Sequence, residues 1–365
     1  MPRVIGIDPG TVSIDVCGLD DGRLFLDESY ATRLALADPA RFVATLESHA
    51  PLDLVAGPSG YGLPLRHARE LSDTDLRLAY LTADGDGGGI GGLRSLARAL
   101  AASDLPVVFT PGVIHLPTVP AHRKVNRVDM GTADKVCATA LAVRDYATRR
   151  GCAITGVSLI LVELGGAFSA AVAVERGQIV DGVGGSSGPM GVHAVGALDG
   201  EVAYLARHVT KSMLFEGGAA AIARADDDSG LEWLAAPTTS SAKLAWFAYM
   251  EGIVKTVATL LVSAPSAREI VLSGRMADFD RVRDDLARRL STIAPQLAIH
   301  RLRGFARAAK QGAQGAALVA NGLAAGREAD LVQTLGIQRA SGTVLDHLAF
   351  ISPSAARARL GITGG

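Results

Sequence analysis

Two short segments of the chain place a carboxylate at the end of an apolar run, directly before a glycine turn. The first is Asp8-Pro9-Gly10-Thr11 and the second is Glu163-Leu164-Gly165-Gly166. A carboxylate at a strand end can hold a metal ion or its water ligands, and the N–H groups of the turn can face phosphate oxygens. Taken alone, the first segment is more simply explained as a hairpin turn.

The second segment repeats the first at a constant offset of 155 residues. Residues that this offset aligns without a gap are Asp8 with Glu163, Gly10 with Gly165, and Gly22 with Gly177. The strand predicted at 14–19 falls on another apolar run at 169–174. Both copies have the order strand, glycine turn, strand, tight turn, strand. An ordered repeat of this kind predicts a duplicated α/β domain and favours a ligand-binding role for both turns.

The densest set of charged groups lies just before a long helix that is predicted to end near residue 150. It contains Arg127, Asp129, Asp134 and Lys135. Solvation of a helix start, with Asp129 or Thr132 as the cap, would explain these charges. A helix N-terminus can also grip a phosphate and place a carboxylate beside it, and we favour this interpretation.

Three glycine-rich segments, at 57–64, 84–92 and 182–191, are predicted as irregular loops. Loops at the carboxyl ends of strands often bind ligands, but a plain strand-to-helix connection explains the first equally well. The second lacks the Gly-Lys-Ser/Thr of a P-loop and carries acidic residues, so we expect a mobile loop there. A further glycine turn, Ser273-Gly274-Arg275, ends a buried strand that is predicted to begin at Glu269.

The composition is that of a soluble globular protein. Of the 365 residues, 48% are hydrophobic and 20% are charged, and the formal net charge of −1 argues against nucleic acid or an anionic membrane as a partner. The length favours two domains. The three cysteines, Cys17, Cys137 and Cys152, lie far apart without metal-ligand or redox spacing. Without a signal-peptide pattern or an apolar run of membrane-spanning length, we expect a cytoplasmic protein.

Across nearly the whole chain, this arrangement resembles the superfamily of actin, sugar kinases and heat-shock ATPases. Asp8-Pro9-Gly10-Thr11 is similar to its first phosphate motif, Glu163-Leu164-Gly165-Gly166 to its second, and Leu272-Ser273-Gly274-Arg275 to its adenosine motif. The Ala- and Gly-rich helix predicted at 306–322 is similar to the packing helix near the end of that fold. The resemblance implies an α/β fold with duplicated ribonuclease-H-like, or actin-like ATPase, domains and an interdomain nucleotide cleft. We place these domains at 1–150 and 151–365.

Within the superfamily, the chain most resembles the acetate and butyrate kinase branch and a mostly archaeal kinase-like family related to butyrate kinases. The segment Val162-Glu163-Leu164-Gly165-Gly166-Ala167-Phe168-Ser169 is similar to that branch's His-Leu-Gly-Gly-Gly-x-Ser. Carboxylate kinases have Asn where this chain has Asp8, and His where it has Glu163. The loop at 57–64 also lacks the arginine of that branch's substrate loop. The resemblance therefore supports nucleotide binding more strongly than an acyl substrate.

The resemblance implies ATP and Mg²⁺ as cofactors. Residues that would hold the nucleotide are Gly10, Thr11, Gly165, Gly166, Ser169, Ser273, Gly274 and Arg275. Residues expected to act in catalysis are Asp8, Arg127, Asp129, Asp134, Lys135 and Glu163. Among them, Asp8 and Glu163 would hold Mg²⁺ through water. Arg127 would neutralise charge on the moving phosphoryl group, and Asp129 or Asp134 would orient or deprotonate an acceptor hydroxyl.

The sequence thus predicts an ATP-dependent small-molecule kinase that is similar to butyrate kinase, with a carboxylate or a hydroxyl as phosphate acceptor. The expected partner is the small-molecule acceptor, without nucleic acid or membrane, and a homodimer is left open. One alternative is a nucleotide-binding sensor that transfers nothing, and another is an ATPase that regulates a partner enzyme. A third treats every glycine turn as a purely structural feature.

Overall fold

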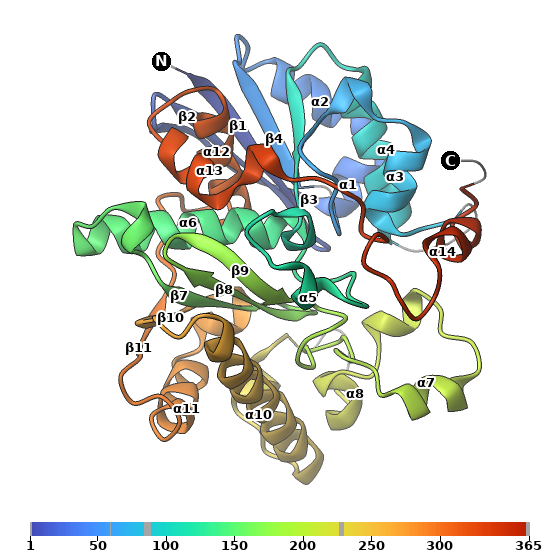
Figure 1. Cartoon of the computed structure of the whole chain (residues 1–365), viewed down its shortest axis with the longest axis vertical. Coiled ribbons are helices and arrows are strands. Elements are labelled where there is room, and N and C mark those ends of the chain that lie inside the picture. Colours follow the sequence, from blue (N-terminus) through green and yellow to red (C-terminus); the bar gives the residue numbers. More distant parts are fainter. Residues whose placement is uncertain (1, 59, 84–88, 226–229, 363–365) are drawn as a thin grey trace.

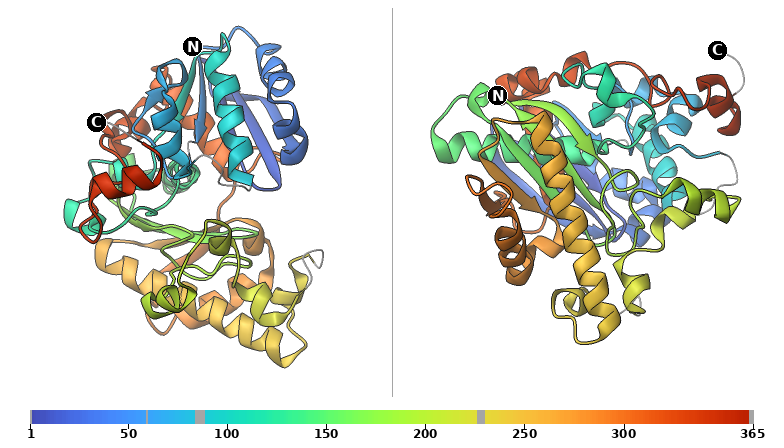
Figure 2. Two further views of the ribbon diagram at one scale, coloured as in Figure 1. Left: turned by 90° about the vertical axis from the view of Figure 1, so that its right-hand side faces the viewer. Right: turned by 60° about the horizontal axis from the view of Figure 1, so that its bottom comes forward.

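The computed structural model describes residues 2–58, 60–83, 89–225 and 230–362, and these form two lobes, each built on one β-sheet (Figures 1 and 2). The strands are β1 (Arg3–Pro9), β2 (Ser13–Asp20), β3 (Arg23–Ala31), β4 (Leu54–Pro58), β5 (Arg66–His67), β6 (Val107–Thr110), β7 (Leu159–Leu164), β8 (Ser169–Glu175), β9 (Gln178–Val183), β10 (Glu269–Ser273) and β11 (Ala298–Arg301). The helices are α1 (Thr32–Ala37), α2 (Pro39–Glu47), α3 (Asp73–Tyr80), α4 (Gly89–Ala102), α5 (Ala121–Lys124), α6 (Ala133–Arg150), α7 (Gly200–Ala206), α8 (Ala219–Ala223), α9 (Glu232–Ala235), α10 (Ser240–Ser263), α11 (Asp280–Leu290), α12 (Gln311–Leu323), α13 (Ala329–Leu335) and α14 (Pro353–Arg359).

The two sheets share one topology over five strands, and the first has β5 as an additional strand, antiparallel to β6 at its edge. The first has the order β3-β2-β1-β4-β6-β5 and the second has the order β11-β10-β7-β8-β9. In each, three antiparallel strands joined by hairpins are followed by strands parallel to the first of them, β4 and β6 beside β1, and β10 and β11 beside β7. The predicted duplicated α/β fold is confirmed.

The predicted offset of 155 residues holds in the strand register. Asp8 pairs with Asp15 across β1 and β2, and the aligned Glu163 pairs with Ala170 across β7 and β8. Both copies have a register shift at the same aligned place, between residues 18 and 19 and between residues 173 and 174. The tight turns match as well, because Gly22 and Gly177 have φ angles of 74° and 76°. The repeat therefore extends to backbone irregularities that no composition bias explains.

Two helices lie between the sheets, α12 against β1, β2 and β4 of the first sheet, and α6 against β7 and β8 of the second (Figure 1). Glycines allow the close packing. An ideal Cβ on Gly6 of β1 would lie 2.1 Å from the backbone nitrogen of Ala317, and one on Gly315 would lie 1.8 Å from the carbonyl oxygen of Cys137 in α6. The predicted Ala- and Gly-rich packing helix is therefore present, and it joins the two lobes through α6.

The packing divides the chain differently from the predicted domains. The prediction assigned all of 151–365 to the second domain, whereas α12 packs on the first sheet and α13 packs on α12. The hydrophobic core around the first sheet accordingly includes residues as late as Leu345 and Ile362. The chain returns to the first lobe after β11 because the small residues of α12 fit closely onto β1. The exact limits of the two domains remain a prediction.

Helix α10 covers the outer face of the second sheet, where it contacts β7, β8 and β9 (Figure 1). Of the described helices, it is long and apolar enough, by length and composition alone, to cross a membrane, although the sequence showed no uninterrupted apolar run of that length. Within its most apolar window, 44% of the residues are buried inside the structure. Its buried side chains, among them Trp246, Tyr249 and Ile253, form much of the second lobe's core.

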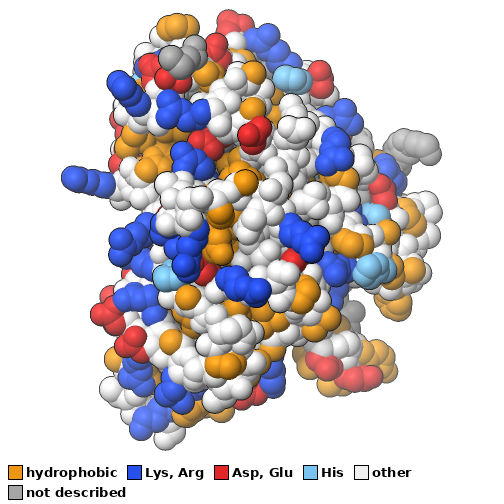
Figure 3. Space-filling view, turned by 60° about the vertical axis from the view of Figure 1, so that its left-hand side comes forward, with side chains coloured by type: hydrophobic (Ala, Val, Ile, Leu, Met, Phe, Trp, Pro, Cys, Tyr) orange, Lys and Arg blue, Asp and Glu red, His pale blue; other side chains and the backbone are white. Residues whose placement is uncertain are grey.

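Charged side chains of both signs are interspersed over both lobes on the face shown in Figure 3. This distribution agrees with the near-zero net charge of the chain. Of the three segments predicted as loops, residues 84–88 of the second lie outside the described residues, and its remainder from Gly89 forms the start of α4.

Candidate active site

The two repeated turns face each other across the start of α6, and four charged side chains meet there. Lys135 lies near the N-terminus of α6, and its Nζ donates to Glu163 Oε1 at 2.8 Å and forms an ion pair with Asp134. Asp8, at the end of β1, interacts electrostatically with all three of these residues. The structure therefore brings Asp8 and Glu163 of the two turns together with Asp134 and Lys135 of the helix start in one cluster, and their catalytic roles stay a prediction.

Burial and like charge set the protonation of this cluster. Burial raises the pKa of Asp8 to about 7, and the Asp134 and Glu163 carboxylates add to the rise. Burial alone would also raise the pKa of Asp134, but Lys135 and a hydrogen bond from Thr132 bring it below its usual value. The two carboxylates outweigh the effect of burial on Lys135 and raise the pKa of its ammonium group. Near neutral pH, Asp134 and Lys135 are charged and Asp8 is close to its titration midpoint.

The first turn is closed by its own backbone and covered by a lysine. The Gly10 N–H donates to the carbonyls of Asp8 and Ser13, so it has no capacity for a phosphate. Among the described residues, the N–H of Thr11 finds no acceptor, and it remains available. The Nζ of Lys310 lies 3.5 Å from the ideal Cβ position of Gly10. A cation and an open N–H group therefore stand together at the tip of this turn.

Lys310 is anchored by two residues of β2. Its Nζ lies 2.9 Å from Asp15 Oδ2 and donates to Ser13 Oγ. Asp15 is fully buried, and it is the cross-strand neighbour of Asp8. Neither Lys310 nor Asp15 was predicted as a site residue from the sequence. The signals that could have revealed them were a carboxylate inside an apolar strand and a lysine immediately before the packing helix.

The second turn repeats the geometry of the first. The Gly165 N–H donates to the carbonyl of Phe168 at 2.9 Å, as Gly10 does to Ser13, while the N–H of Gly166 has no acceptor among the described residues. Arg275 is exposed, and its Cδ lies 3.6 Å from the ideal Cβ position of Gly166. Arg275 can therefore reach an anion held at the second turn.

Gly274 lies against this turn. It has φ = 85°, and an ideal Cβ would lie 2.4 Å from the carbonyl oxygen of Leu164. A side chain at this position would push the third glycine turn away from the second. The structure thus brings the predicted adenosine motif to the second phosphate motif.

The two predicted serines lie on opposite faces of the second sheet. Ser273 pairs in register with Glu163, and its buried Oγ has no hydrogen-bond partner in the described part of the chain. Ser169 is fully buried toward Tyr249 of α10, on the far face. Because alternate strand residues project to opposite faces, Ser273 borders the cluster and Ser169 does not.

Arg127 and Asp129 do not join the cluster. The guanidinium of Arg127 is exposed and makes no hydrogen bond or ion pair with any described residue. Asp129 is buried and accepts hydrogen bonds from the backbone N–H and the hydroxyl of Ser186, both at 2.9 Å, and from the Gly131 N–H. Asp129 therefore ties the glycine-rich loop at 182–191 to the segment before α6, which is a positioning role in this conformation.

The loop at 57–64 also reaches the start of α6. The carbonyl of Gly60 accepts from the Ala133 N–H at 2.9 Å. Tyr61 of this loop accepts a hydrogen bond from Lys211 of the second lobe at 3.3 Å, and the Lys211 ammonium lies 4.4 Å from the ring centroid. The loops at 57–64 and 182–191 therefore both contact the segment that leads into Asp134 and Lys135.

The charge of the site fits a divalent cation. No group of three or more His, Cys, Asp or Glu side chains is arranged around one metal position in the described ranges. The acidic and basic side chains at the first turn and the cluster are Asp8, Asp15, Asp134 and Glu163 with Lys135 and Lys310, a formal net charge of −2. One Mg²⁺ would balance it, and Mg²⁺ commonly takes one or two carboxylates with water and phosphate oxygens as its other ligands.

Comparison with solved structures shows which proteins share this architecture. A propionate kinase from Francisella tularensis subsp. tularensis SCHU S4 aligns with a TM-score of 0.61 and 13% identity, over 86% of this chain and 99% of that one. Acetate kinases align similarly, from Porphyromonas gingivalis (TM-score 0.58, 13% identity, 87% and 98% coverage) and from Entamoeba histolytica (0.57, 12%, 80% and 87%). The chain therefore has the actin-like ATPase fold of these kinases, as the sequence predicted.

The sequence itself identifies a family. No curated protein sequence matches the chain. A family model described as "Protein of unknown function (DUF1464)" matches residues 6–350, and the chain belongs to this family.

Proposed function

We propose that this DUF1464 protein is an ATP-dependent small-molecule phosphotransferase of the cytoplasm that is related to butyrate kinase. The observation that carries the proposal is the cluster of Asp8, Asp134, Lys135 and Glu163, where two turns of matched register meet between the lobes. A fold used only as a scaffold has no reason to gather three partly buried carboxylates around one lysine at this point, because bringing like charges together is costly. The likeness to acetate and propionate kinases in fold supports the proposal.

The triphosphate of ATP would lie between the two turns. The open N–H groups of Thr11 and Gly166 would donate to its oxygens, and Lys310 and Arg275 would neutralise its charge from either side. Mg²⁺ would be held by Asp8 and, through the oxygen not bonded to Lys135, by Glu163. When bound, Mg²⁺ neutralises charge on the β- and γ-phosphates. The charge of the metal ion would favour the ionised form of Asp8.

Lys135 and Asp134 would act by position and charge. Lys135 holds the Asp134 and Glu163 carboxylates apart from each other and fixes their orientation. Transfer of a phosphoryl group depends mainly on positioning and electrostatic stabilisation, to which an arginine can contribute about 10³-fold or more. Arg127, exposed and unpaired within the described residues, is available for this role if the lobes close on substrate.

The acceptor would enter between the loops at 57–64 and 182–191. A carboxylate acceptor is already anionic and needs no general base. A hydroxyl acceptor must lose a proton, and Asp134 is a carboxylate of the cluster whose lowered pKa keeps it ionised for this purpose. Asp8 and Glu163 stand where carboxylate kinases have Asn and His, so acceptors of both classes belong in the test.

The test is formation of ADP from Mg-ATP by the purified full chain, with short carboxylates, sugars and polyols as acceptors. We expect acceptor-dependent ADP formation that Asp8→Ala abolishes while the circular dichroism spectrum stays native. Calorimetry with a non-hydrolysable ATP analogue measures binding separately. Absence of both binding and turnover in the wild-type chain would refute the proposal.

A second candidate is a nucleotide sensor that transfers nothing. It is favoured by the replacement of the acyl-kinase Asn and His by Asp8 and Glu163, and by the pairing of Glu163 with Lys135. For this candidate, ATP would raise the melting temperature while no acceptor increased ADP formation. An ATPase that activates a partner through a cysteine-bound cluster has less support, since Cys17 and Cys137 are buried and Cys152 is exposed elsewhere.

A further inference from the structure

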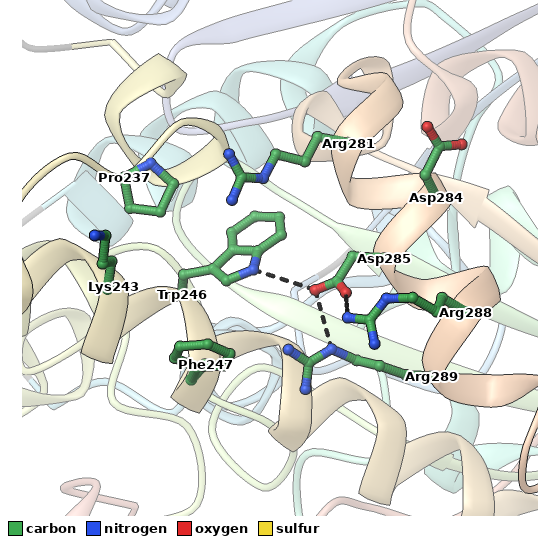
Figure 4. Close-up of a pocket in the computed structure, with 9 residues that line it drawn as sticks. All are labelled: Pro237, Lys243, Trp246, Phe247, Arg281, Asp284, Asp285, Arg288 and Arg289. Atoms are coloured by element: carbon green, nitrogen blue, oxygen red, sulfur yellow. Dashed lines mark hydrogen bonds and ion pairs between the residues drawn. The ribbon is translucent and has the colours of Figure 1, made fainter.

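A groove with a volume of about 580 Å³ lies between α10 and α11 of the second lobe (Figure 4). Binding sites for small molecules commonly have volumes of about 300–1,000 Å³. The lining side chains come from the two helices and from Pro237 just before α10. None of the residues of the two turns or of the charged cluster contributes to it. The groove is therefore a cavity that the proposed phosphotransfer site does not use.

One wall of the groove is held rigidly by Asp285 of α11. Its carboxylate accepts a hydrogen bond from Trp246 Nε1 at 3.1 Å and one from Arg289 Nε at 3.0 Å, and it forms an ion pair with Arg288 (Figure 4). Burial alone would raise the pKa of Asp285, but the two arginines lower it below its usual value. The indole of Trp246 is thereby fixed and is 4% exposed.

Two cations at the groove have no carboxylate partner. The guanidinium of Arg281 lies over the Trp246 ring at 5.2 Å from its centroid, and Lys243 extends from α10 (Figure 4). Neither side chain makes a hydrogen bond or an ion pair with the described residues. Stacking on a fixed indole orients Arg281 before any ligand arrives, which lowers the entropic cost of binding.

The groove as a whole is positive. Its charged side chains are Lys243, Arg281, Arg288, Arg289, Asp284 and Asp285, a formal net charge of +2. Two apolar side chains also line the groove. They are Pro237 and Phe247, which is 57% exposed and has the Arg289 guanidinium 5.6 Å from its ring centroid. A phosphate monoester carries about −1.5 to −2 charges near pH 7, which matches the excess positive charge.

We propose that this groove is a second ligand site, which takes an organic phosphate with a flat apolar part. The phosphate lies between Lys243 and Arg281, and the apolar part lies on Phe247 and Pro237. The site is separate from the one at the two turns, and its ligand binds whether or not the protein transfers phosphate.

Trp246 supplies a direct probe. The chain has two tryptophans, and Trp233→Phe leaves Trp246 as the single fluorophore. In this variant, phenyl phosphate should change the fluorescence saturably, because it alters the stacking of Arg281. Benzoate, with one charge, should bind at least threefold more weakly, and phenol should have no saturable effect.

Charge removal tests the recognition. Lys243→Gln combined with Arg281→Gln should weaken phenyl phosphate binding at least tenfold. Lys255→Gln is the matched control, since Lys255 lies exposed on the same helix and pairs with Glu251 away from the groove. It should leave binding unchanged. Circular dichroism establishes that each variant is folded.

Three results would overturn the proposal. These are a wild-type-like response of the double variant, an equal response to phenol and phenyl phosphate, and no response at all. Binding of a non-hydrolysable ATP analogue, measured by calorimetry, should be the same in the double variant as in the wild type. Loss of that affinity would make the groove part of the nucleotide site and would also refute a separate site.

Discussion

Replacement of Asp8 by Asn should stabilise the protein and at the same time abolish its activity. Asp8 is confined with two other carboxylates, and its ionised form is disfavoured in the folded chain. The isosteric amide removes this repulsion without leaving a cavity. It also removes the carboxylate that we propose for Mg²⁺. Opposite changes in stability and activity are typical of residues that are retained for function.

The magnitude follows from the pKa of Asp8, which rises from 3.8 to about 7 on folding. That rise corresponds to a cost of about 4 kcal/mol for holding Asp8 ionised in the folded state. Below pH 4, both folded and unfolded chains keep the proton, so the cost is absent. Between pH 4 and 7 the unfolded chain releases its proton first, and the wild type therefore loses stability as the pH rises. We expect Asp8→Asn to gain about 2–4 kcal/mol at pH 8 and less than about 1 kcal/mol at pH 4.

The assay is urea unfolding followed by circular dichroism at pH 4, 6 and 8, in EDTA to exclude divalent cations. Asp15→Asn is the matched control, because Asp15 is the cross-strand neighbour of Asp8 but pairs with Lys310 at 2.9 Å. It should lose about 1.5–3 kcal/mol at pH 8, the usual contribution of hydrogen bonds to charged groups. Lower stability of Asp8→Asn than of the wild type at pH 8, or a gain in stability at pH 4 equal to that at pH 8, would contradict this prediction.

Three further substitutions test other parts of the structure. Lys310→Gln should weaken binding of an ATP analogue at least tenfold in calorimetry, and unchanged affinity would exclude Lys310 from the phosphate site. Gly315→Ala should cost about 3 kcal/mol or more in urea unfolding, because its Cβ would overlap the backbone of α6, whereas Gly200→Ala, in open space, should stay within about 0.5 kcal/mol. Burial alone would raise the pKa of Glu269, but two arginines of α6 lower it below its usual value. Glu269→Gln should therefore lower the melting temperature at pH 7, and the difference from the wild type should disappear as the pH falls below about 4. A deficit that persists at pH 3 would show that the arginines are not its cause.

Much of the fold could be predicted from the sequence because the repeat is local. The strand ending in Asp8 and the strand ending in Glu163 are each followed by a glycine turn, and both patterns fall within a few residues. The packing helix was visible from its spacing of Ala and Gly. The packing of α12 on the first sheet could not be predicted from the sequence, because it depends on the fit of one helix surface to a strand far away in the chain.

The site was predictable only in part. Asp134 and Lys135 were singled out as charges at a helix start, and the structure places them with Asp8 and Glu163. Ser169 was predicted from a motif, but the pleat of β8 turns it to the opposite face. Arg127 and Asp129 precede the helix that carries Lys135. The directions in which their side chains point depend on the backbone between residues 126 and 132, and the structure leaves both outside the cluster.

The sequence by itself determined the two carboxylate-ended strands, their glycine turns and the offset that relates them. These features depend on local backbone preferences and on alternation of apolar residues, which a linear pattern records. Only the tertiary structure decided that Lys310 covers the turn of Gly10, 300 residues earlier in the chain. It alone decided that the pKa of Asp8 rises to about 7. Both depend on distance and burial in three dimensions, because electrostatic energy varies with the separation of charges and with their exclusion from water.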